Sequence, residues 1–178
     1  MEQFTAAVTG CVVAHQAVAP FVALILAMAE TTAILSLVIP STALLMAVGA
    51  TVSTGAIPFM PIWAGAAVGS LIGSTFSWWL GRRFGDFALK LWPMRENPDL
   101  VTRGRKVFAD WGPFAVLIGH FVGPLRAVVF LIAGMSTMSF LRFQLVNVVG
   151  AITWAFVIPK SGELGGNLAA WFWHYLSF

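Results

Sequence analysis

One arginine lies inside an otherwise uncharged stretch of the chain. In residues 111–141, Arg126 is the only residue with a formal charge. The segment HFVGPLRAVVFLIAG begins at His120 and places Gly123 and Pro124 just before the arginine. A guanidinium stays protonated at biological pH and presents its donors as a planar fork, which suits bidentate binding of a phosphate. These residues predict recognition of an anion, with His120 as a second group that can titrate near neutral pH.

One acid occupies a comparable position in the first half of the chain. Glu30 is the only Asp or Glu between Glu2 and Asp86, and it precedes Pro40 by ten residues. Burial disfavours the charged form of a carboxylate, whereas a neighbouring cation favours it. Glu30 is therefore a candidate proton carrier, or a partner that balances the charge of Arg126.

Each of these side chains also has a purely structural interpretation. Arg126 could extend to the headgroup region or form a permanent bridge with Glu30. Glu30 could face headgroup water at a helix end, and His120 could be a packed core residue. A charge at the bilayer centre costs at least about 2.5–3.5 kcal/mol, which favours a functional interpretation of the arginine.

The composition indicates which solvent surrounds these groups. Of the 178 residues, 59% are hydrophobic and 10% are charged, and the mean hydropathy is +0.88. Soluble domains carry about 25% charged residues. Residues 3–29 and 31–81 have no formal charge, and about 20 apolar residues suffice to cross a bilayer. The sequence predicts an all-α, polytopic membrane protein with a single membrane domain over residues 1–178.

The positive charge is concentrated in one loop. The net charge is +3, and seven of the ten Lys and Arg residues lie within residues 82–106. This pattern is typical of a loop that obeys the positive-inside bias rather than of a nucleic-acid-binding face. We expect residues 81–112 to lie in the cytoplasm and no nucleic acid to be a partner. Because the first basic residue is Arg82, we expect no cleavable signal peptide, and the side on which the amino terminus lies stays open.

Two segments are interrupted in a similar way. Residues 21–50 are broken at Pro40, and residues 113–137 are broken at Gly123-Pro124. Paired proline-interrupted segments in the two halves indicate a transporter-like inverted repeat with a site between them, although two proline kinks can also coincide by chance. We expect two opposed re-entrant helical hairpins with these residues at their tips. Their half-helices would direct positive dipole ends toward the site.

The remaining helices are expected at residues 59–80 and 143–178. The latter is predicted as two helices, 143–158 and 165–178, separated by the polar segment PKSGELGG. Small residues spaced by four positions allow helices to approach closely. The residues predicted to serve helix packing are Gly65, Gly69, Gly73 and Gly134.

Three stretches of the chain also carry a family resemblance. They are IPSTALLMAVGA after Glu30, then GAAVGSLIGSTFSWWLGRRFG, then GHFVGPLRAVVFLIAGMSTMSFLRFQLVNVVGAITW, and together they cover roughly residues 20–155. The chain resembles the DedA family of membrane proteins, also called the SNARE-associated or VTT-domain family. The resemblance implies two re-entrant hairpins that face each other across the membrane. It also implies translocation of a lipid, either undecaprenyl phosphate or a phospholipid in bacteria, with scramblase-like relatives in eukaryotes.

The resemblance extends to the two buried charges. Glu30 aligns with the membrane-embedded acid of the family, and Arg126 aligns with the second arginine of its RFxPGxR-like motif. The family pattern is broken where His120 replaces the first arginine, Ser41 and Thr42 replace a glycine and an acid, and Ser74 replaces an aspartate. The loss of these charges favours a passive, scramblase-like role.

Together these features predict a lipid translocase of the bacterial cytoplasmic membrane. An anionic lipid headgroup would bind Arg126, helped by His120, Ser41 and Thr42, and Glu30 would exchange a proton. A water-soluble anion suits the same cation, so a proton-coupled transporter of small solutes is an alternative, and a membrane-embedded lipid phosphatase is a further one. The oligomeric state stays open.

We expect neither enzymatic activity nor a cofactor. GxSxG, HExxH, CxxC and Walker motifs do not occur in the sequence. The histidines His15, His120 and His174 lie far apart, so no metal site is expected, and the single Cys11 excludes a disulfide within the chain.

Overall fold

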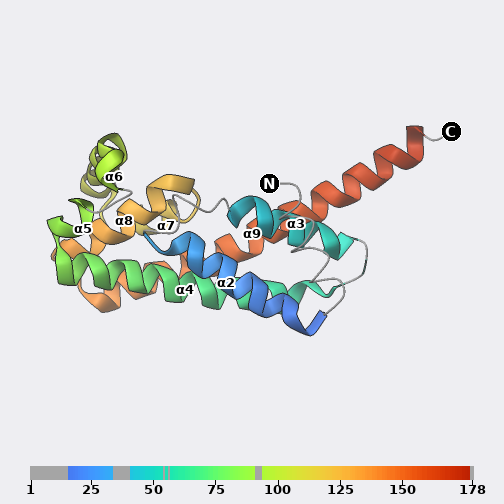
Figure 1. Ribbon diagram of the computed structural model, residues 1–178, viewed down its shortest axis with the longest axis horizontal. Coiled ribbons are helices and arrows are strands. Elements are labelled where there is room, and N and C mark those ends of the chain that lie inside the picture. The colour runs from blue at the N-terminus through green and yellow to red at the C-terminus, as the bar shows by residue number, and fades with distance from the viewer. Residues whose placement is uncertain (1–15, 34–40, 54, 56, 91–93, 177–178) are drawn as a thin grey trace.

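The computed structural model describes residues 16–33, 41–53, 55, 57–90 and 94–176. All regular elements in these ranges are helices (Figure 1). In chain order they are η1 (Gln16–Val18), α2 (Ala19–Thr31), α3 (Ser41–Ser53), α4 (Phe59–Phe84), α5 (Asp86–Lys90), η3 (Met94–Glu96), α6 (Pro98–Trp111), α7 (Phe114–Gly119), α8 (Gly123–Met135) and α9 (Phe140–Leu176).

Helix α2 ends nine residues before the proline at which the sequence predicted a break. Its last helical residue is Thr31, and Thr32 has extended backbone angles. The hydroxyl of Thr31 donates to the carbonyl of Ala27 at 2.8 Å, and that of Thr32 donates to Met28 at 2.7 Å. These bonds supply donors to carbonyls at the helix end. Pro40 itself lies outside the described residues.

Helices α2 and α4 lie side by side and pack through small residues (Figure 1). A Cβ atom added to Gly65, Gly69 or Gly73 of α4 would collide with the backbone of α2. The facing side of α2 carries alanines that are fully buried, namely Ala19, Ala23 and Ala27. The absence of larger side chains therefore lets the two backbones touch, as in the close helix contacts of membrane proteins.

The two short helices α3 and α8 each pack on the long helix of the opposite half. Gly134 of α8 lies against the backbone of Trp78 on α4, and Gly49 of α3 lies against the backbone of Pro159 on α9. Trp78 and Pro159 each come nineteen residues after the first residue of their helices. The two contacts thus occur at the same number of residues from the start of α4 and of α9.

A second pair of glycines repeats this register from the long helices. Gly81 of α4 lies against the backbone of Leu131, and Gly162 of α9 lies against the backbone of Met46. In both halves the contact is three residues further along the long helix and three residues earlier on the short one. The α3–α9 and α8–α4 contacts are therefore built alike.

Helix α9 differs from the sequence expectation. The prediction of separate helices at 143–158 and 165–178 is wrong, because one helix runs through the polar segment between them. Pro159 lies inside this helix and removes one backbone donor without ending it. Lys160 and Glu163 form an ion pair at 2.9 Å one turn apart, so their charges are compensated within the helix. The carboxyl-terminal part of α9 extends away from the other helices (Figure 1).

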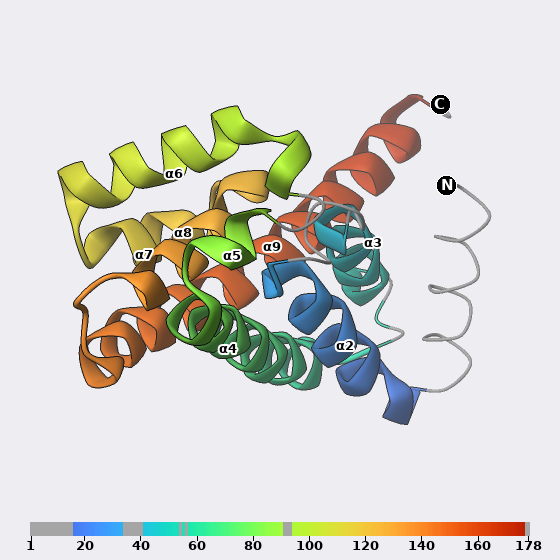
Figure 2. The ribbon, with the colours of Figure 1, turned by 60° about the vertical axis from the view of Figure 1, so that its left-hand side comes forward.

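Residues 111–141 do not form one continuous helix. Helix α6 ends at Trp111, α7 has only six residues, and the chain leaves helical geometry at Val122 before α8 begins. The proline that follows Gly123 occupies the first turn of α8, where its missing N–H costs nothing. Figure 2 shows α6 lying across α7 and α8, on the side of the molecule away from α3. The polar segment 81–112 thus contains helices that cover α8.

Two helices in the described ranges are long and apolar enough to cross a membrane, Phe59–Phe84 and Phe140–Leu168. Helices α2 and α3 are apolar but shorter. Much of the outward surface is apolar as well. Examples of exposed large apolar side chains are Phe21, Ile25, Met60, Leu145 and Leu168. Such a surface is unusual for a protein that faces water and is expected for one that faces lipid.

Candidate functional site

The two buried charges that the sequence singles out form an ion pair. The Nη1 atom of Arg126 lies 2.9 Å from Oε1 of Glu30, and the two side chains are 2% and 6% exposed. Glu30 lies in the last turn of α2, and Arg126 lies in the first turn of α8. The breaks that end α2 and begin α8 thus bring an acid from the first half against a base from the second.

Two further side chains complete this cluster. The hydroxyl of Thr42, in the first turn of α3, donates to Oε1 of Glu30. On the other side, Cζ of Arg126 lies 4.8 Å from the ring centroid of Trp154, which is fully buried on α9. A cation over an aromatic face is attracted by the ring quadrupole, and more strongly where water is excluded. We refer to Glu30, Thr42, Arg126 and Trp154 as the Arg126 cluster; its members come from α2, α3, α8 and α9.

Several polar atoms of the Arg126 cluster remain available. Within the described part of the chain, Oε2 of Glu30, Nε of Arg126 and Nε1 of Trp154 are buried and have no hydrogen-bond partner. The 2.9 Å contact between Nη1 of Arg126 and Oε1 of Glu30 is an ion pair whose geometry is not that of a hydrogen bond. Buried polar groups in proteins are almost always paired, so two unpaired donors and one unpaired acceptor set this cluster apart from an ordinary structural ion pair.

His120 forms no hydrogen bond with Glu30 or Arg126. Its Nδ1 atom is 2.9 Å from the carbonyl oxygen of Val116, and its ring centroid is 4.8 Å from that of Phe130. Nε2 is buried and has no hydrogen-bond partner among the described residues. The ring rests on Gly150 of α9, where an added Cβ would be 2.6 Å from Nδ1. The structure therefore packs His120 against α9 and leaves one ring nitrogen free.

The other predicted site residues lie at helix starts or bond within their own helix. Gly123 and Pro124 are the first two residues of α8, and Ser41 is the first residue of α3, with its side chain outside the described part. Ser74 donates its hydroxyl to the carbonyl of Ser70 on its own helix at 2.7 Å. Of the predicted polar residues, the structure thus brings together Arg126, Glu30 and Thr42.

Sequence reasoning missed two sets of residues. Trp154 and Gly150 contact predicted site residues, but an uncharged side chain in an apolar helix gives no local signal of such a contact. Asn147 donates to Gln144, and Gln144 donates to Thr75 of α4, both at 2.9 Å. Two amides spaced by three residues in an apolar helix could have indicated this partly buried network.

Metal-ligating side chains do not cluster in the described part of the chain. There, no group of three or more His, Cys, Asp and Glu side chains is placed to hold an ion. The only buried ionisable residues in that part are Glu30, His120 and Arg126.

Comparisons with known proteins agree on one family. The VTT domain matches residues 39–164, a range that contains Thr42, Arg126 and Trp154. Inner membrane protein YabI of Escherichia coli (strain K12) is 31% identical over 80% of this chain and 56% of its own length. An uncharacterized membrane protein of Buchnera aphidicola subsp. Schizaphis graminum is 26% identical over 70% of this chain and 50% of its own.

The matches also include a mycobacterial protein. Uncharacterized membrane protein Rv2637 of Mycobacterium tuberculosis is 35% identical over 53% of this chain and 46% of its own length. The chain thus spans about half the length of the curated relatives it matches. No solved structure matches it. The chain belongs to the VTT-domain family, that is, to the DedA family of membrane proteins.

Proposed function

We propose that this protein moves a lipid with an anionic phosphate headgroup across the bacterial cytoplasmic membrane, and that it acts as a transporter rather than an enzyme. The observation that carries the proposal is the buried Arg126, held by an acid and an indole where α2, α3 and α8 begin or end. Discontinuous helices that meet at a charged site are typical of transporters. A charge kept in such a position marks a substrate path more often than a structural element.

The geometry suggests how a phosphate would bind. A phosphate oxygen competes with the carboxylate of Glu30 for the guanidinium, whose Nε atom has no partner in the described residues. Trp154 stays in contact with Arg126 during this exchange, so the cation keeps one neighbour. Glu30 then takes up a proton, since an uncompensated carboxylate is costly at this depth. Nε2 of His120 supplies a further polar contact.

The matched glycine contacts support the inverted repeat on which this mechanism depends. The contacts of α3 with α9 and of α8 with α4 have the same register, as expected if α2–α4 and α7–α9 are two copies of one unit. In an inverted repeat, α3 and α8 are the inner arms of two opposed re-entrant hairpins. Rocking of one unit against the other would then expose Arg126 to either side.

The location and orientation follow from the charges. We propose that the segment 81–112 lies in the cytoplasm, because it carries seven of the ten basic residues. The name of the Escherichia coli relative, inner membrane protein YabI, supports the cytoplasmic membrane. The Arg126 cluster would then lie between the two leaflets.

The proposal is tested with the purified protein in sealed vesicles that contain a fluorescent polyprenyl phosphate or a fluorescent phospholipid. A membrane-impermeant quencher added outside reports how fast the lipid in the inner leaflet becomes accessible. We expect wild type to accelerate this exchange, Arg126→Gln to abolish it, and the exposed control Arg142→Gln to behave as wild type.

Three results would contradict the proposal. Equal exchange by wild type and Arg126→Gln would remove the arginine from the mechanism. Uptake of a small anion driven by a pH gradient, without lipid exchange, would identify a solute transporter instead. Release of free phosphate from the lipid would identify a phosphatase.

Two substitutions of Trp154 distinguish the contribution of the ring's volume from that of its charge distribution. Trp154→Phe keeps an aromatic face under Arg126, whereas Trp154→Leu removes it. A buried cation–π contact is worth about 2 kcal/mol and is present with and without the lipid, so we expect Trp154→Leu to lower the free energy of unfolding by at least this amount and Trp154→Phe to lower it less. The measurement is thermal unfolding in detergent. Equal losses in the two variants would show that only the volume of the indole matters.

A further inference from the structure

Three polar side chains follow one another along one face of α9 toward the Arg126 cluster. Gln144 is half-buried, Asn147 is fully buried one turn later, and the ring of His120 rests on Gly150 after one further turn. Trp154 of the Arg126 cluster comes one turn after Gly150. We refer to the two amides and the histidine as the polar ladder.

Helix α8 gives a second measure of how far His120 lies from the guanidinium. The ring centroid of Phe130 is 4.8 Å from that of His120, and Phe130 follows Arg126 by four residues on α8. On α9, Gly150 precedes Trp154 by the same four residues. Both helices therefore place His120 one turn from Arg126, about 6 Å along either axis, and the charge of Arg126 acts on the ring at this distance.

Successive levels of this region each hold a buried polar atom that has no hydrogen-bond partner among the described residues. These atoms are Oδ1 of Asn147, Nε2 of His120 and Oε2 of Glu30. The Nδ1 atom of His120 lies 2.9 Å from the carbonyl oxygen of Val116, which can only accept. In the neutral ring Nδ1 therefore carries the hydrogen and Nε2 keeps its lone pair. All three atoms are acceptors, and buried acceptors without a protein partner are normally paired with water.

The polar ladder begins near the membrane surface and leads to mid-depth. Arg142 is exposed on α9 two residues before Gln144, and an exposed cation marks the level of the headgroups because it is costly in lipid. Along the helix axis, Gln144 lies about 3 Å below this level and Trp154 about 18 Å below it. An apolar core is about 30 Å thick, so the ladder spans the distance from one membrane face to the Arg126 cluster.

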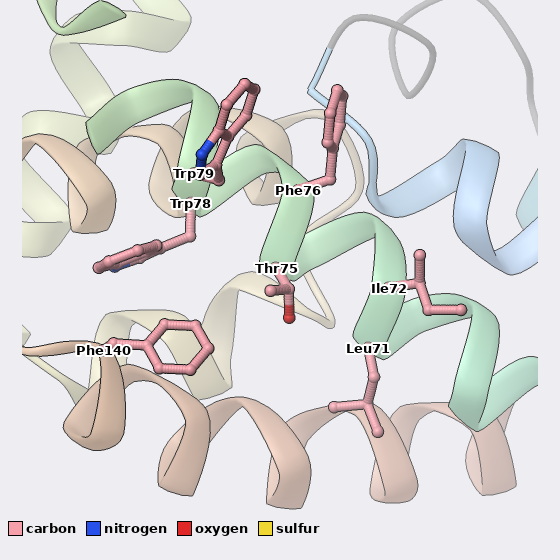
Figure 3. A pocket seen from close by; sticks show the side chains of 7 residues that line it. All are labelled: Leu71, Ile72, Thr75, Phe76, Trp78, Trp79 and Phe140. Atoms are coloured by element: carbon pink, nitrogen blue, oxygen red, sulfur yellow. The ribbon is translucent and has the colours of Figure 1, made fainter. Parts of the chain in front are cut away.

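The outer end of the polar ladder is fixed to α4. The side-chain amide of Gln144 donates to Oγ1 of Thr75 at 2.9 Å, and Figure 3 shows Thr75 on the side of α4 that faces α9. Arg82, also on α4, donates to the carbonyl of Ser136 just before α9 at 3.0 Å. The ladder therefore begins at the end of the molecule where the basic segment 81–112 starts, which is the cytoplasmic end in the proposed orientation.

We propose that the polar ladder holds a chain of water molecules that carries a proton between the cytoplasm and Glu30. This rests on the proposed function, in which Glu30 takes up a proton when a phosphate binds Arg126. A protonated water at Asn147 gives its proton to Nε2 of His120, whose lone pair forms the new N–H bond. Nε2 then releases that proton through a second water to Oε2 of Glu30. The ring returns to its neutral form, and the carboxylate becomes a carboxylic acid.

The charges around His120 drive the proton in this direction. Arg126 on α8 repels a proton on the ring, and Glu30 on α2, next to Arg126, attracts it. Helix α7 contributes the carbonyl of Val116 and α9 contributes Asn147 near the ring, and neither group titrates. Helix α6 packs on α7, and its charged side chains are all exposed. A proton on His120 is therefore short-lived and passes on to the carboxylate.

The test follows the protonation of Glu30 in the purified full chain in detergent. After a rapid jump to acidic pH, the infrared band of the protonated carboxyl appears, and its absence from Glu30→Gln identifies it. We expect His120→Phe to slow the rise of this band about a hundredfold, the lower end of what one positioned proton carrier contributes, with the final amplitude of wild type. Asn147→Leu is expected to slow the rise about tenfold, the factor that one hydrogen bond gives.

Rescue and a matched control distinguish a proton carrier from a packed ring. His120→Ala leaves room for free imidazole, which is expected to restore the fast rise in this variant. Imidazole should have no effect on His120→Phe, where the phenyl ring fills the same space. Thr153→Leu introduces the same side chain as Asn147→Leu at an exposed position of α9, and it should become protonated as fast as wild type.

Three outcomes would overturn the proton path. Wild type and His120→Phe could show equal rates, imidazole could leave the rate of His120→Ala unchanged, or Thr153→Leu could slow the rise as much as Asn147→Leu. Should His120→Phe fail to fold, His120→Ala and Asn147→Leu still decide the assignment.

The infrared measurement does not depend on lipid, so it fails separately from the proposed function. Lipid exchange that requires Arg126, together with equal protonation rates in wild type and His120→Phe, would keep the transporter and remove the path. Fast protonation that requires His120, without lipid exchange in vesicles, would keep the path and remove the transporter.

Discussion

Replacing Arg126 by methionine is expected to destabilise the protein by about 3–5 kcal/mol, because the change leaves a buried carboxylate without its cation. Glu30 is 6% exposed, and Arg126 is its only partner of opposite charge among the described residues. The hydroxyl of Thr42 cannot replace a cation. Glu30→Leu is expected to have an effect of similar size, since it leaves the guanidinium unpaired over Trp154.

The double variant Glu30→Leu with Arg126→Met separates stability from transport. With both charges gone, nothing buried remains unpaired by the change, and apolar side chains of similar volume often substitute for a buried ion pair without loss. We expect unfolding of the double variant in detergent to return close to that of wild type, while lipid exchange stays absent. Thermal unfolding and the vesicle assay measure the two properties on the same preparations. Arg142→Met, at an exposed position, should change neither.

If the double variant unfolded as easily as the single ones, the loss would come from packing rather than from an unpaired charge. If it still moved lipid at the rate of wild type, the ion pair would be structural.

Replacing Gly134 by valine is expected to prevent correct assembly of α8 on α4. An added Cβ at this position would overlap the backbone carbonyl of Trp78 and approach the amide nitrogen of Arg82. A backbone cannot rotate away as a side chain can. The loss of folding free energy is therefore larger than the value typical of overpacking between side chains, which is about 1–3 kcal/mol. The expected result is loss of the folded, monodisperse protein in size-exclusion chromatography and of the thermal transition.

A matched glycine provides the control for this prediction. Gly165 of α9 has nothing within 4 Å of an added Cβ, so Gly165→Ala should be at least as stable as wild type, since alanine favours a helix. The register of the two halves adds a second test, because Gly49→Val should fail in the same way as Gly134→Val. A folded Gly134→Val protein would mean that α8 and α4 are further apart than described.

The sequence was informative about charges and poor at long-range contacts. In an apolar chain each buried charge needs a partner, so the sequence predicts the pairing of Glu30 with Arg126 as one of several alternatives. Trp154 carries no charge and follows Arg126 by 28 residues, so nothing local connects it to the guanidinium. The contact exists only because the fold packs α9 next to the start of α8, and this packing is a long-range feature.

The helix ends show the same limit. A proline predicts a break from its own geometry, yet α2 ends at Thr31, where threonine hydroxyls bond to the last carbonyls. In α9, Pro159 predicts a break that does not occur, because the neighbouring turns are buried against α3 and the helix continues through them. Tertiary packing decides where both helices end, and a local sequence motif carries no information about that packing.

The exchange of short helices between the halves has a consequence for biogenesis. Helix α3 has 13 residues, about 20 Å in length, so it cannot cross an apolar core of about 30 Å without help. Its Gly49 rests on Pro159, which the ribosome adds 110 residues later. During synthesis α3 therefore lacks the surface on which it packs until α9, the last helix of the described residues, has been made.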